Sequence, residues 1–427
     1  MTEVNQLNKS ELEEQLEQLK KKYESYKEKE LALDMSRGKP CPEQVDLSRP
    51  MLDLVTSEDL LKTDSGVDVR NYGGLDGLAE AKEFFAPILG VAPAEVIIGG
   101  NSSLTMMHDT IARAMLFGVV DSEKPWSKLE KVKFICPSPG YDRHFAICEL
   151  FGIEMITVDL LEDGPDMDKV EELVKEDATI KGIWCVPKYS NPMGNTFSDE
   201  IVNRLAKMET KANDFRIFWD NAYAIHHLTL VHDKLKNIYD ACVEAGNENR
   251  VFLFASTSKV TFPGAGVAAM AASPDNVTKI KSELSIQTIG PDKMNQLRHV
   301  RFFEKEGSLE EHMKKHAELI KPKFDKTIEL FEKFLGGKGI ATWLSPVGGY
   351  FISIDTLDGC AKEVVALAKE AGVTLTGAGA TYPYGKDPYD SNIRIAPTFP
   401  SLDELEVAIE IFCLCVEIVS IEKKLAA

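Results

Sequence analysis

Between residues 65 and 300 the chain alternates short apolar runs with segments of helical periodicity. The apolar runs are rich in β-branched and aromatic residues, which favour strands. Strands that alternate with helices in this way are typical of an α/β domain built on a mostly parallel sheet. The predicted strands are Val96–Ile98, Val132–Ile135, Glu154–Val158, Gly182–Val186, Ile217–Trp219, Val251–Phe254 and Gly266–Ala271.

Polar segments follow several of these predicted strands. They are Gly99–Ser103, Asn191–Gly194, Asp220–Tyr223 and Ser256–Lys259. Each has an ordinary explanation, because a lysine after a strand is often solvated, an aspartate can cap a helix, and Asn-Pro-x-Gly is a common turn. Open α/β sheets nevertheless bind their ligands at strand ends. The combination of these segments therefore favours a binding site.

Lys259 and Asp220 are the two residues in these segments with the most specific chemistry. Asp220 directly follows one apolar, partly aromatic strand, and Lys259 follows another after a short polar stretch. We expect both side chains to reach a polar pocket at the strand ends. A lysine that forms a Schiff base and an aspartate that pairs with a pyridinium nitrogen are required in a pyridoxal phosphate enzyme. The pair predicts pyridoxal 5'-phosphate as the cofactor.

The length and charge of the chain restrict its class further. A chain of 427 residues exceeds what one hydrophobic core usually supports, which predicts two domains. The net charge of −19 disfavours a nucleic-acid partner. The 8 cysteines form no C-x-x-C motif and no zinc spacing with histidine, so we expect no metal site and reduced, buried thiols. The sequence has no signal-peptide pattern and no apolar run long enough for a membrane span, so we expect a cytoplasmic protein.

The remaining segments predict how the domains are divided. We expect a helix over residues 8–34 that begins at a capping box, Ser10 to Glu13, and a loop rich in helix breakers after it. Further capping boxes are predicted at Ser308 and Ser401, and further strands at Tyr350–Ile354, Val373–Thr376 and Asn392–Ile395. We expect residues 1–64 to be an N-terminal helix and loop that pack with the smaller domain. Residues 65–307 would form the large cofactor-binding domain, and residues 308–427 the smaller α+β domain.

The chain resembles the fold-type I pyridoxal phosphate enzymes of the class I/II aminotransferase family. Within it, the chain is similar to the bacterial aspartate aminotransferases that carry Ser-Arg-Gly-Lys-Pro and Asn-Tyr-Gly-Gly-Leu-Asp-Gly, here Ser36–Pro40 and Asn71–Gly77. The resemblance spans essentially the whole chain, with the family's motifs in the family's order. It implies a large domain with a mostly parallel, seven-stranded sheet and a smaller α+β domain.

The resemblance also implies roles for the catalytic residues. Lys259 would form the Schiff base with the cofactor and then move the substrate proton, for which its pKa must fall. Asp220 would keep the pyridine nitrogen protonated. Asn191 and Tyr223 would hydrogen-bond the phenolic oxygen of the cofactor, and Tyr141 would stack on its ring.

The cofactor phosphate would lie at a helix start, where backbone N–H groups and the helix dipole favour an anion. Its implied ligands are Gly100, Asn101, Ser102, Ser103, Ser256 and Ser258. Tyr72 would reach the phosphate from a neighbouring subunit, which implies a homodimer with active sites at its interface. In one respect the chain departs from the family, because Gly264–Val267 lacks the arginine that most relatives place there. The phosphate would then be neutralised by other groups.

The substrate would be held by Arg394, which matches the family arginine for the α-carboxylate and has the planar fork that suits this task. Gly38 would offer its backbone to the same carboxylate. A second carboxylate on the substrate needs another cation, for which we expect Lys293, presented from the partner subunit. The sequence leaves Arg37, Lys39, Arg143 and Arg298 open as rivals.

Other polar residues of these segments have ordinary explanations. We expect His108, His144, His226 and His227 to be polar residues without a catalytic role. Asp142 and Arg143 are expected to pair with each other.

The resemblance implies a ping-pong transamination through the Lys259 Schiff base, with L-aspartate as the amino donor and 2-oxoglutarate as the acceptor. One alternative is an aminotransferase for aromatic or 2-aminoadipate-like donors, or a β-lyase. Another is a cofactor-binding transcriptional regulator without enzymatic activity. Such regulators carry a basic DNA-binding domain ahead of the aminotransferase-like domain, whereas here a mixed-charge helical segment precedes the first loop. The expected partners are small amino acids and 2-oxo acids, without nucleic acid or membrane.

Overall fold

The computed structural model describes residues 6–305 and 307–426. Residues 1–5, which belong to the segment searched for a signal peptide, lie outside the described residues. The main feature is a sheet of 8 strands in the order β2-β9-β8-β7-β6-β3-β4-β5. The strands are β2 (Val96–Ile98), β3 (Lys133–Ser138), β4 (Glu154–Leu161), β5 (Gly164–Pro165), β6 (Ile180–Cys185), β7 (Arg216–Asp220), β8 (Val251–Ser256) and β9 (Ala268–Ala271).

The sheet is mostly parallel, as predicted. Strands β4, β3, β6, β7 and β8 pair in parallel, whereas β9, β2 and β5 join by antiparallel pairing. All of the strands predicted for this sheet form. The additional strand β5 has only 2 residues, too few for a pattern in the sequence to reveal.

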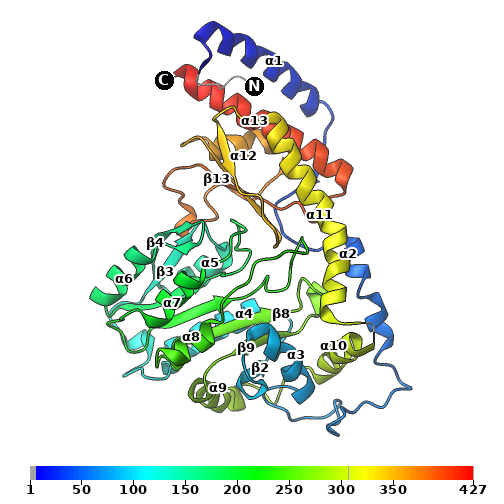
Figure 1. The fold of residues 1–427 in the computed structure, drawn as a ribbon, viewed down its shortest axis with the longest axis vertical. Coiled ribbons are helices and arrows are strands. Elements are labelled where there is room, and N and C mark those ends of the chain that lie inside the picture. Colours follow the sequence, from blue (N-terminus) through cyan, green and yellow to red (C-terminus); the bar gives the residue numbers. More distant parts are fainter. Residues whose placement is uncertain (1–5, 306, 427) are drawn as a thin grey trace.

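Helices cover both faces of this sheet (Figure 1), because successive side chains of a strand point to opposite faces. One face packs against α3 (Ala79–Leu89), α6 (Met167–Glu176), α7 (Asp199–Lys207), α8 (Ile238–Glu244) and α10 (Lys293–Lys305). The other packs against α4 (Ser103–Phe117), α5 (Asp142–Leu150) and α9 (Pro274–Gln287). Burial on both faces explains why these strands read as continuous apolar runs.

A second hydrophobic core lies beside the large sheet. It contains an antiparallel sheet of β10 (Ala341–Trp343), β11 (Ile352–Thr356) and β13 (Asn392–Ile395). The helices α11 (Leu309–Phe334), α12 (Ala361–Glu370) and α13 (Leu402–Ala426) pack against it. Figure 1 shows α11, in yellow, running along one side of the molecule past both sheets. The short helix α2 (Pro42–Asp46) lies next to α11.

The N-terminal helix differs from its prediction at both ends. Helix α1 spans Lys9–Lys27, and its N-cap is Asn8, which forms a capping box with Glu11 in place of the predicted pair Ser10 and Glu13. The predicted helix to residue 34 is wrong. Leu33–Asp34 form a short strand, β1, that pairs in parallel with β12 (Val373–Thr374). The predicted capping boxes at Ser308 and Ser401 are confirmed.

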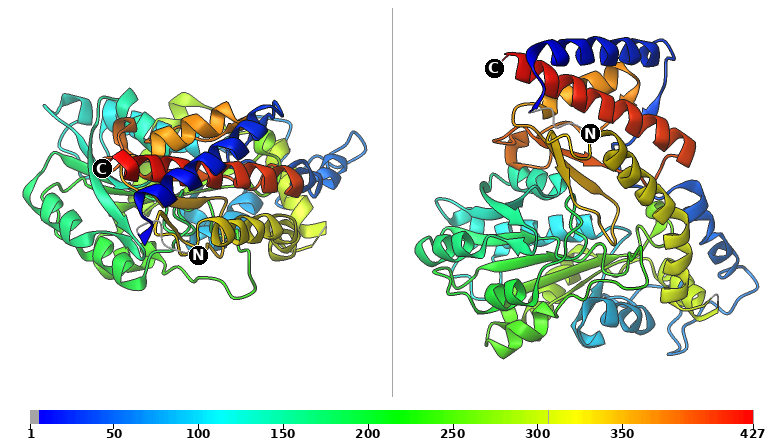
Figure 2. Two further views of the ribbon diagram at one scale, coloured as in Figure 1. Left: turned by 90° about the horizontal axis from the view of Figure 1, so that it is seen from above. Right: turned by 45° about the horizontal axis from the view of Figure 1, so that its top comes forward.

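The N-terminal segment packs on the second core. The Tyr23 hydroxyl donates a hydrogen bond to the Leu367 carbonyl at 2.9 Å, and the Tyr26 hydroxyl donates to Glu410 at 2.7 Å. Both views in Figure 2 place α1 (blue) against α13 (red). These contacts agree with the predicted association of the N-terminal segment, although the domain boundaries themselves stay a prediction.

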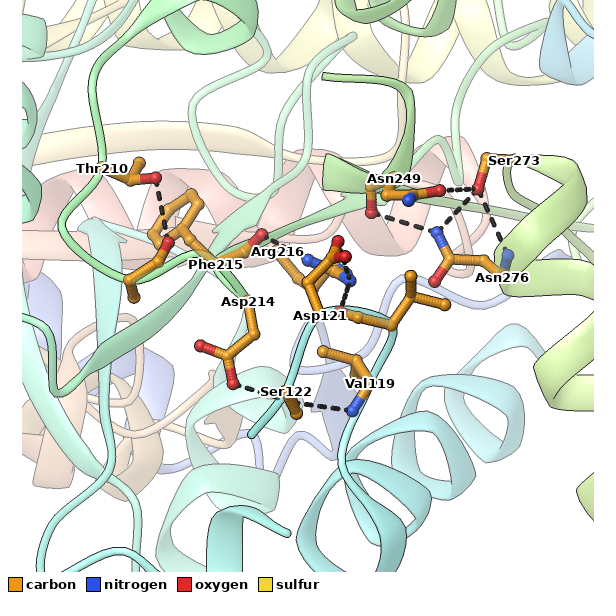
Figure 3. A network of polar contacts seen from close by, with 12 residues as sticks. Val119, Asp121, Ser122, Thr210, Asp214, Phe215, Arg216, Asn249, Ser273 and Asn276 are labelled. Atoms are coloured by element: carbon orange, nitrogen blue, oxygen red, sulfur yellow. Dashed lines mark hydrogen bonds and ion pairs between the residues drawn. The ribbon is translucent and has the colours of Figure 1, made fainter. Parts of the chain in front are cut away.

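A polar network holds the amino-terminal ends of β7 and β8, opposite to the ends that carry Asp220 and Ser256 (Figure 3). Arg216, the first residue of β7, donates to the Phe215 carbonyl at 3.0 Å. Ser122 donates to the Asp214 carboxylate at 2.8 Å, and Asn276 donates to the Asn249 carbonyl at 3.0 Å. The network ties loops and helices to the strands at this edge.

Some structural features concern the expected chemistry. All 8 cysteines are buried and free. Within the described residues, no group of three or more His, Cys, Asp or Glu side chains could hold a metal ion. Of the helices in the same part of the chain, none has the length and apolar character needed to cross a membrane.

Candidate active site

A cavity of 590 Å³ lies at the carboxyl ends of β7 and β8, facing the smaller sheet. Side chains from both sheets line it, because Asp220 ends β7 and Arg394 lies in β13. The predicted site residues in its wall are Gly38, Ser102, Ser103, Tyr141, Asn191, Asp220, Tyr223, Ser256, Ser258, Lys259 and Arg394. Gly100 and Asn101 directly precede this wall, whereas Tyr72 and Lys293 do not line the cavity.

Asp220 is held by a histidine that we had expected to be an ordinary polar residue. The His144 ring N–H donates to Asp220 Oδ2, with 3.0 Å between Nε2 and the oxygen, and both side chains are buried. The other oxygen, Oδ1, is buried and has no hydrogen-bond partner among the described residues. Because buried polar atoms are nearly always paired, this oxygen is prepared to accept a hydrogen bond from a ligand.

Lys259 lies in the same cavity, with its Nζ 5.1 Å from the centre of the Tyr223 ring. Burial lowers the pKa of the Lys259 ammonium, the Asp220 carboxylate opposes this shift, and the Arg394 charge adds to it. Burial raises the pKa of Tyr223 well above its ordinary value. The cavity therefore favours a neutral amine next to a protonated phenol.

Arg394 is fixed by groups from three segments. Its Nη1 lies 3.1 Å from Asp142 Oδ1 and 3.1 Å from Asn191 Oδ1, and its Nη2 donates to Thr376 Oγ1 at 3.1 Å. The Nε atom is buried without a partner. The expected pairing of Asp142 with Arg143 is therefore wrong, since the Asp142 carboxylate lies against Arg394.

The loop that carries Gly38 is closely packed against the cavity wall. A Cβ atom at Gly38 would lie 2.4 Å from Phe351 Cζ and would clash with the ring, so the close packing here requires glycine. The Phe351 ring centre lies 4.7 Å from the guanidinium carbon of Arg394. Gly38, Phe351 and Arg394 thus form one packed unit.

The candidate phosphate site is built around the start of α4. The Ser102 hydroxyl caps this helix by accepting a hydrogen bond from the Leu104 N–H at 3.2 Å. Ser256 donates to Ser258 at 3.0 Å, and Ser258 donates to the Asn101 carbonyl at 3.0 Å. Hydroxyl groups and a helix N-terminus thus meet at one end of the cavity, an arrangement that suits an anion.

The turn that lacks the family arginine packs against this anion site. A Cβ atom at Gly266 would lie 3.3 Å from the Asn101 carbonyl oxygen. From α10, the Asn295 amide donates to the carbonyls of Ala265 and Gly266 at 3.0 Å and 2.9 Å, and Arg298 donates to Asn295. Arg298 thus supports the turn from behind and does not line the cavity.

A group of buried polar side chains holds the backbone next to Lys259. The His226 ring lies 3.3 Å from the Lys259 carbonyl, and the His312 Nε2 lies 2.7 Å from the Val260 carbonyl. His316 Nε2 lies 3.1 Å from His312 Nε2, and the Gln44 amide nitrogen is 3.0 Å from His316 Nδ1. Because α11 carries both His312 and His316, this group connects the helix that spans both sheets to the segment of Lys259.

Tyr72 and Lys293 lie close to each other outside the cavity, with Tyr72 exposed and Lys293 buried. The Lys293 ammonium donates to the Gly73 carbonyl at 2.7 Å, and the Tyr72 side chain next to it is 83% exposed. The sequence-based expectation gave both residues to a partner subunit. In the single chain Tyr72 stands on the surface, Lys293 is buried against the neighbouring backbone, and neither lines the cavity.

Sequence reasoning missed the contacts of His144, Thr376 and Phe351 in this site. The one available signal for His144 was its position three residues after Tyr141, at the start of α5, where the two ring centres lie 4.9 Å apart. Its ring stacks on Trp184, with 4.3 Å between the ring centres. Phe351 directly precedes β11 and Thr376 follows β12, whereas Lys259 follows β8 of the large sheet. No motif in the sequence marks Phe351 or Thr376.

Comparisons with known proteins agree with this arrangement. The sequence profile of the family described as aspartate amino-transferase matches residues 7–427. An aspartate aminotransferase of Corynebacterium glutamicum is 48% identical over 406 residues, which are 95% of this chain and 94% of that protein. The crystal structure of an aspartate transaminase from the same species has a TM-score of 0.96 and 46% identity, and covers 99% of each chain.

A more distant structure shares the fold. It is the α-aminoadipate aminotransferase of Thermus thermophilus complexed with N-(5'-phosphopyridoxyl)-L-leucine, with a TM-score of 0.74 and 20% identity, covering 91% of this chain and 92% of that one. Together with the matches above, it confirms the fold that the sequence predicts.

Proposed function

Because this chain belongs to the aspartate aminotransferase family, we propose that this aminotransferase moves the amino group of L-aspartate to 2-oxoglutarate, with pyridoxal 5'-phosphate as cofactor. One observation carries the proposal. A single cavity holds the Lys259 amine, an Asp220 carboxylate with an unpaired buried oxygen, and the Arg394 guanidinium. These are an acid–base group, a partner for a protonated ring nitrogen, and a carboxylate receptor.

The residues around Asp220 fit the ring of the cofactor. Leaving Oδ1 of Asp220 buried and unpaired is unfavourable, and a pyridinium N–H would satisfy it. When bound, the cofactor supplies an electron sink for the negative charge that remains after the substrate loses its α-proton. Asp220 would hold the proton on the ring nitrogen, and His144 would keep the carboxylate oriented for this task. Tyr141 would cover one face of the ring.

Lys259 would carry the substrate proton. Burial lowers its pKa, so that the neutral amine that acts as a base is available nearer to neutral pH. Asn191 accepts a hydrogen bond from Arg394 through its oxygen, which leaves its amide N–H groups to donate to the cofactor's phenolic oxygen. Tyr223, held protonated by burial, would donate to the same oxygen.

The phosphate would be bound by Gly100, Asn101, Ser102 and Ser103 at the start of α4, with Ser256 and Ser258 as further donors. Helix N-termini carry a partial positive charge that favours phosphate. In place of the missing arginine, this helix end and the serine hydroxyls would offset the charge of the phosphate. Arg394, with the backbone of Gly38, would bind the substrate α-carboxylate.

A homodimer is part of the proposal. Three large side chains are exposed in the single chain, namely Tyr72 (83%), Ile286 (90%) and Ile289 (61%). Large apolar side chains gathered on a surface usually mark an interface. The loops of Tyr72 and Ile289 approach each other closely, since a Cβ atom at Gly290 would be 2.8 Å from the Gly73 carbonyl, and Ile286 lies in the last turn of α9. In a dimer through this surface, Tyr72 would reach the partner's phosphate, and Lys293 would approach the partner's cavity.

Mixing two inactive variants tests the dimer and the role of Tyr72 in trans. We expect Lys259→Ala and Tyr72→Ala each to lose activity as pure proteins. After unfolding and refolding together, hybrid dimers should regain intact sites, about one quarter of the total for a random mixture. Light scattering should give the mass of a dimer. A monomeric mass, or no recovery of activity in proven hybrids, would reject this part of the proposal.

The domain boundaries and the compartment are proposals as well. We propose an N-terminal segment of residues 1–64 that packs with the small domain, a large domain of residues 65–307 and a small domain of residues 308–427. The separate cores of the two sheets support this division. The free, buried cysteines favour a reducing compartment such as the cytoplasm.

The decisive experiment for the function is a spectrum and a donor profile. The purified protein should show visible absorbance from bound cofactor, which aspartate bleaches with release of oxaloacetate and 2-oxoglutarate restores. Values of kcat/KM should be higher for aspartate than for phenylalanine or 2-aminoadipate. A clear preference for either of the latter would reject aspartate as the donor. DNA binding without turnover would instead support a regulator.

A further inference from the structure

Three cationic side chains line the cavity besides Lys259 and Arg394, namely Arg37, Lys39 and Arg143. A dicarboxylate whose α-carboxylate lies on Arg394 needs a further cation for its second carboxylate, because an unpaired charge in a pocket is strongly disfavoured. Lys293 and Arg298 do not line the cavity of their own chain. The three lining cations are therefore the first candidates.

The two cations of the N-terminal loop lie near a carboxylate of their own loop. Lys39 Nζ lies 3.8 Å from the centre of the Phe399 ring, a cation–π contact that draws it to one side. Burial raises the pKa of the nearby Asp34 carboxyl, but hydrogen bonds from Ser36 and the charges of Lys39 and Arg37 outweigh this, and the pKa is lowered. Arg37 and Lys39 thus already face a carboxylate of their own loop.

Arg143 differs from both. The adjacent carboxylate, Asp142, pairs with Arg394 at 3.1 Å and so is not held by Arg143. Across residues 6–305 and 307–426, no carboxylate lies within ion-pair distance of the Arg143 guanidinium. The wall of the cavity therefore presents two guanidiniums without an ion pair among the described residues, of which Arg37 lies near Asp34 and Arg143 stands next to the Asp142–Arg394 pair.

Arg143 also lies near the receptor for the first carboxylate. Burial raises the pKa of Tyr141 to about 12, with contributions from Asp220 and Asp142, while Arg143 and Arg394 both act to lower it. The two guanidiniums thus lie near the same phenol, and both line the cavity together with Asp142. A substrate anchored on Arg394 would extend its side chain within this region.

We propose that Arg143 binds the side-chain carboxylate of dicarboxylic amino acids and 2-oxo acids and thereby sets the preference of the site for them. Its planar fork can donate two parallel hydrogen bonds to a carboxylate, and the first turn of α5 carries it at the wall of the cavity. This inference rests on the proposed function and specifies its substrate class. It assigns the second carboxylate to the same chain as Arg394.

The test compares holoenzyme variants by their ratio of kcat/KM for aspartate to kcat/KM for a donor without a side-chain carboxylate, alanine or phenylalanine. Arg143→Gln should lower this ratio on the order of 10- to 100-fold, the effect of losing one charge-assisted pair. Arg143→Lys keeps the charge but loses the planar fork, so its ratio should lie between those of the wild type and Arg143→Gln. Arg37→Gln and Lys39→Gln, at the two other lining cations, are the matched controls and should change the ratio less than about threefold, since screened charges outside the contact act weakly.

A binding measurement separates this inference from the chemistry of turnover. Maleate, a dicarboxylate without an amino group, should have its Kd raised by Arg143→Gln by about the same factor as the ratio above. An unchanged ratio and unchanged maleate Kd in Arg143→Gln would overturn the inference, as would an equal selective loss in a control variant. A wild-type protein that does not transaminate aspartate would reject the proposed function itself. Aspartate turnover in the wild type without selective loss in Arg143→Gln would reject only the role of Arg143.

Discussion

The His144 ring donates to Asp220 Oδ2 across 3.0 Å and leaves the other oxygen of this carboxylate buried without a partner. Oδ2 thus fixes the position of the carboxylate, and Oδ1 can accept a hydrogen bond from another donor. The stacking of His144 on Trp184 keeps the imidazole in place, with an angle of 9° between the two rings. This geometry supports the proposal that Asp220 would hold a protonated ring nitrogen.

Asp220 and His144 should therefore differ in how much they contribute. Asp220→Ala removes the partner of the ring nitrogen, and we expect kcat to fall on the order of 10³-fold, together with loss of bound cofactor. His144→Asn should lower kcat about tenfold, because the carboxylate remains but loses one orienting bond. Cofactor content from absorbance and kcat from an oxaloacetate assay check both. Equal effects of the two variants would contradict the division of roles.

Lys259→Ala should abolish turnover without harming the fold. The loss of the proton-carrying amine should lower kcat by at least about 10⁴-fold. Burial lowers the pKa of this ammonium, so the charged form is disfavoured in the folded protein, and its removal should leave the melting temperature unchanged or raised. Calorimetry and the activity assay test the two parts separately. A marked fall in the melting temperature would show that Lys259 also stabilises the fold.

Gly38→Ala should disturb both stability and substrate binding. The new Cβ atom would lie 2.4 Å from Phe351 Cζ, and relief of the clash should cost about 1–3 kcal/mol of unfolding free energy. Because Phe351 packs on Arg394, the KM for aspartate should rise as well. The double variant Gly38→Ala/Phe351→Leu should recover part of both losses. Gly377→Ala is the matched control, since its Cβ atom would meet nothing within 4 Å.

The histidines behind Lys259 should make stability depend on pH. Burial lowers the pKa of His316 and of His226 to about 3, against an ordinary value of 6.5. As the pH falls below 6.5, the unfolded chain binds protons that the folded chain does not, so stability is complete above this pH and is lost toward pH 3. Each histidine should remove about 2 kcal/mol between pH 6.5 and pH 5.

Urea unfolding of the wild type and His316→Gln at pH 7 and pH 5 measures this dependence. The variant should be less stable at pH 7, because a buried partner of Gln44 is lost, but its stability should fall about 2 kcal/mol less on acidification. The same pH dependence in both proteins would contradict the expectation that His316 is neutral in the fold.

Much of the fold could be predicted because its signals are local. The strands of the large sheet are short apolar runs, and the capping boxes at Ser308 and Ser401 are four-residue patterns, so each can be recognised without its neighbours. The end of α1 could not be predicted from the sequence. The Leu33 N–H donates a hydrogen bond to the Gly372 carbonyl at 2.8 Å, which places this residue in a strand. Distant pairing of this kind overrides helix propensity.

The candidate site divides in the same way. Its strand-end residues, Lys259 and Asp220 among them, were found because strand ends in an α/β sheet meet on one edge. The His144 contact with Asp220 spans 76 positions, and the Arg394 contact with Thr376 joins β13 to a loop of the smaller core. No spacing in the sequence reports such contacts.

The sequence by itself determined which chemical groups this protein has and at which strand ends they stand, since apolar runs, turns and caps act over a few residues. Only the tertiary structure decided how the charges are matched. Asp142 pairs with Arg394, 252 positions away, and not with its neighbour Arg143. That choice depends on the packing of β13 against the start of α5, which brings a distant guanidinium closer to the carboxylate than the adjacent one.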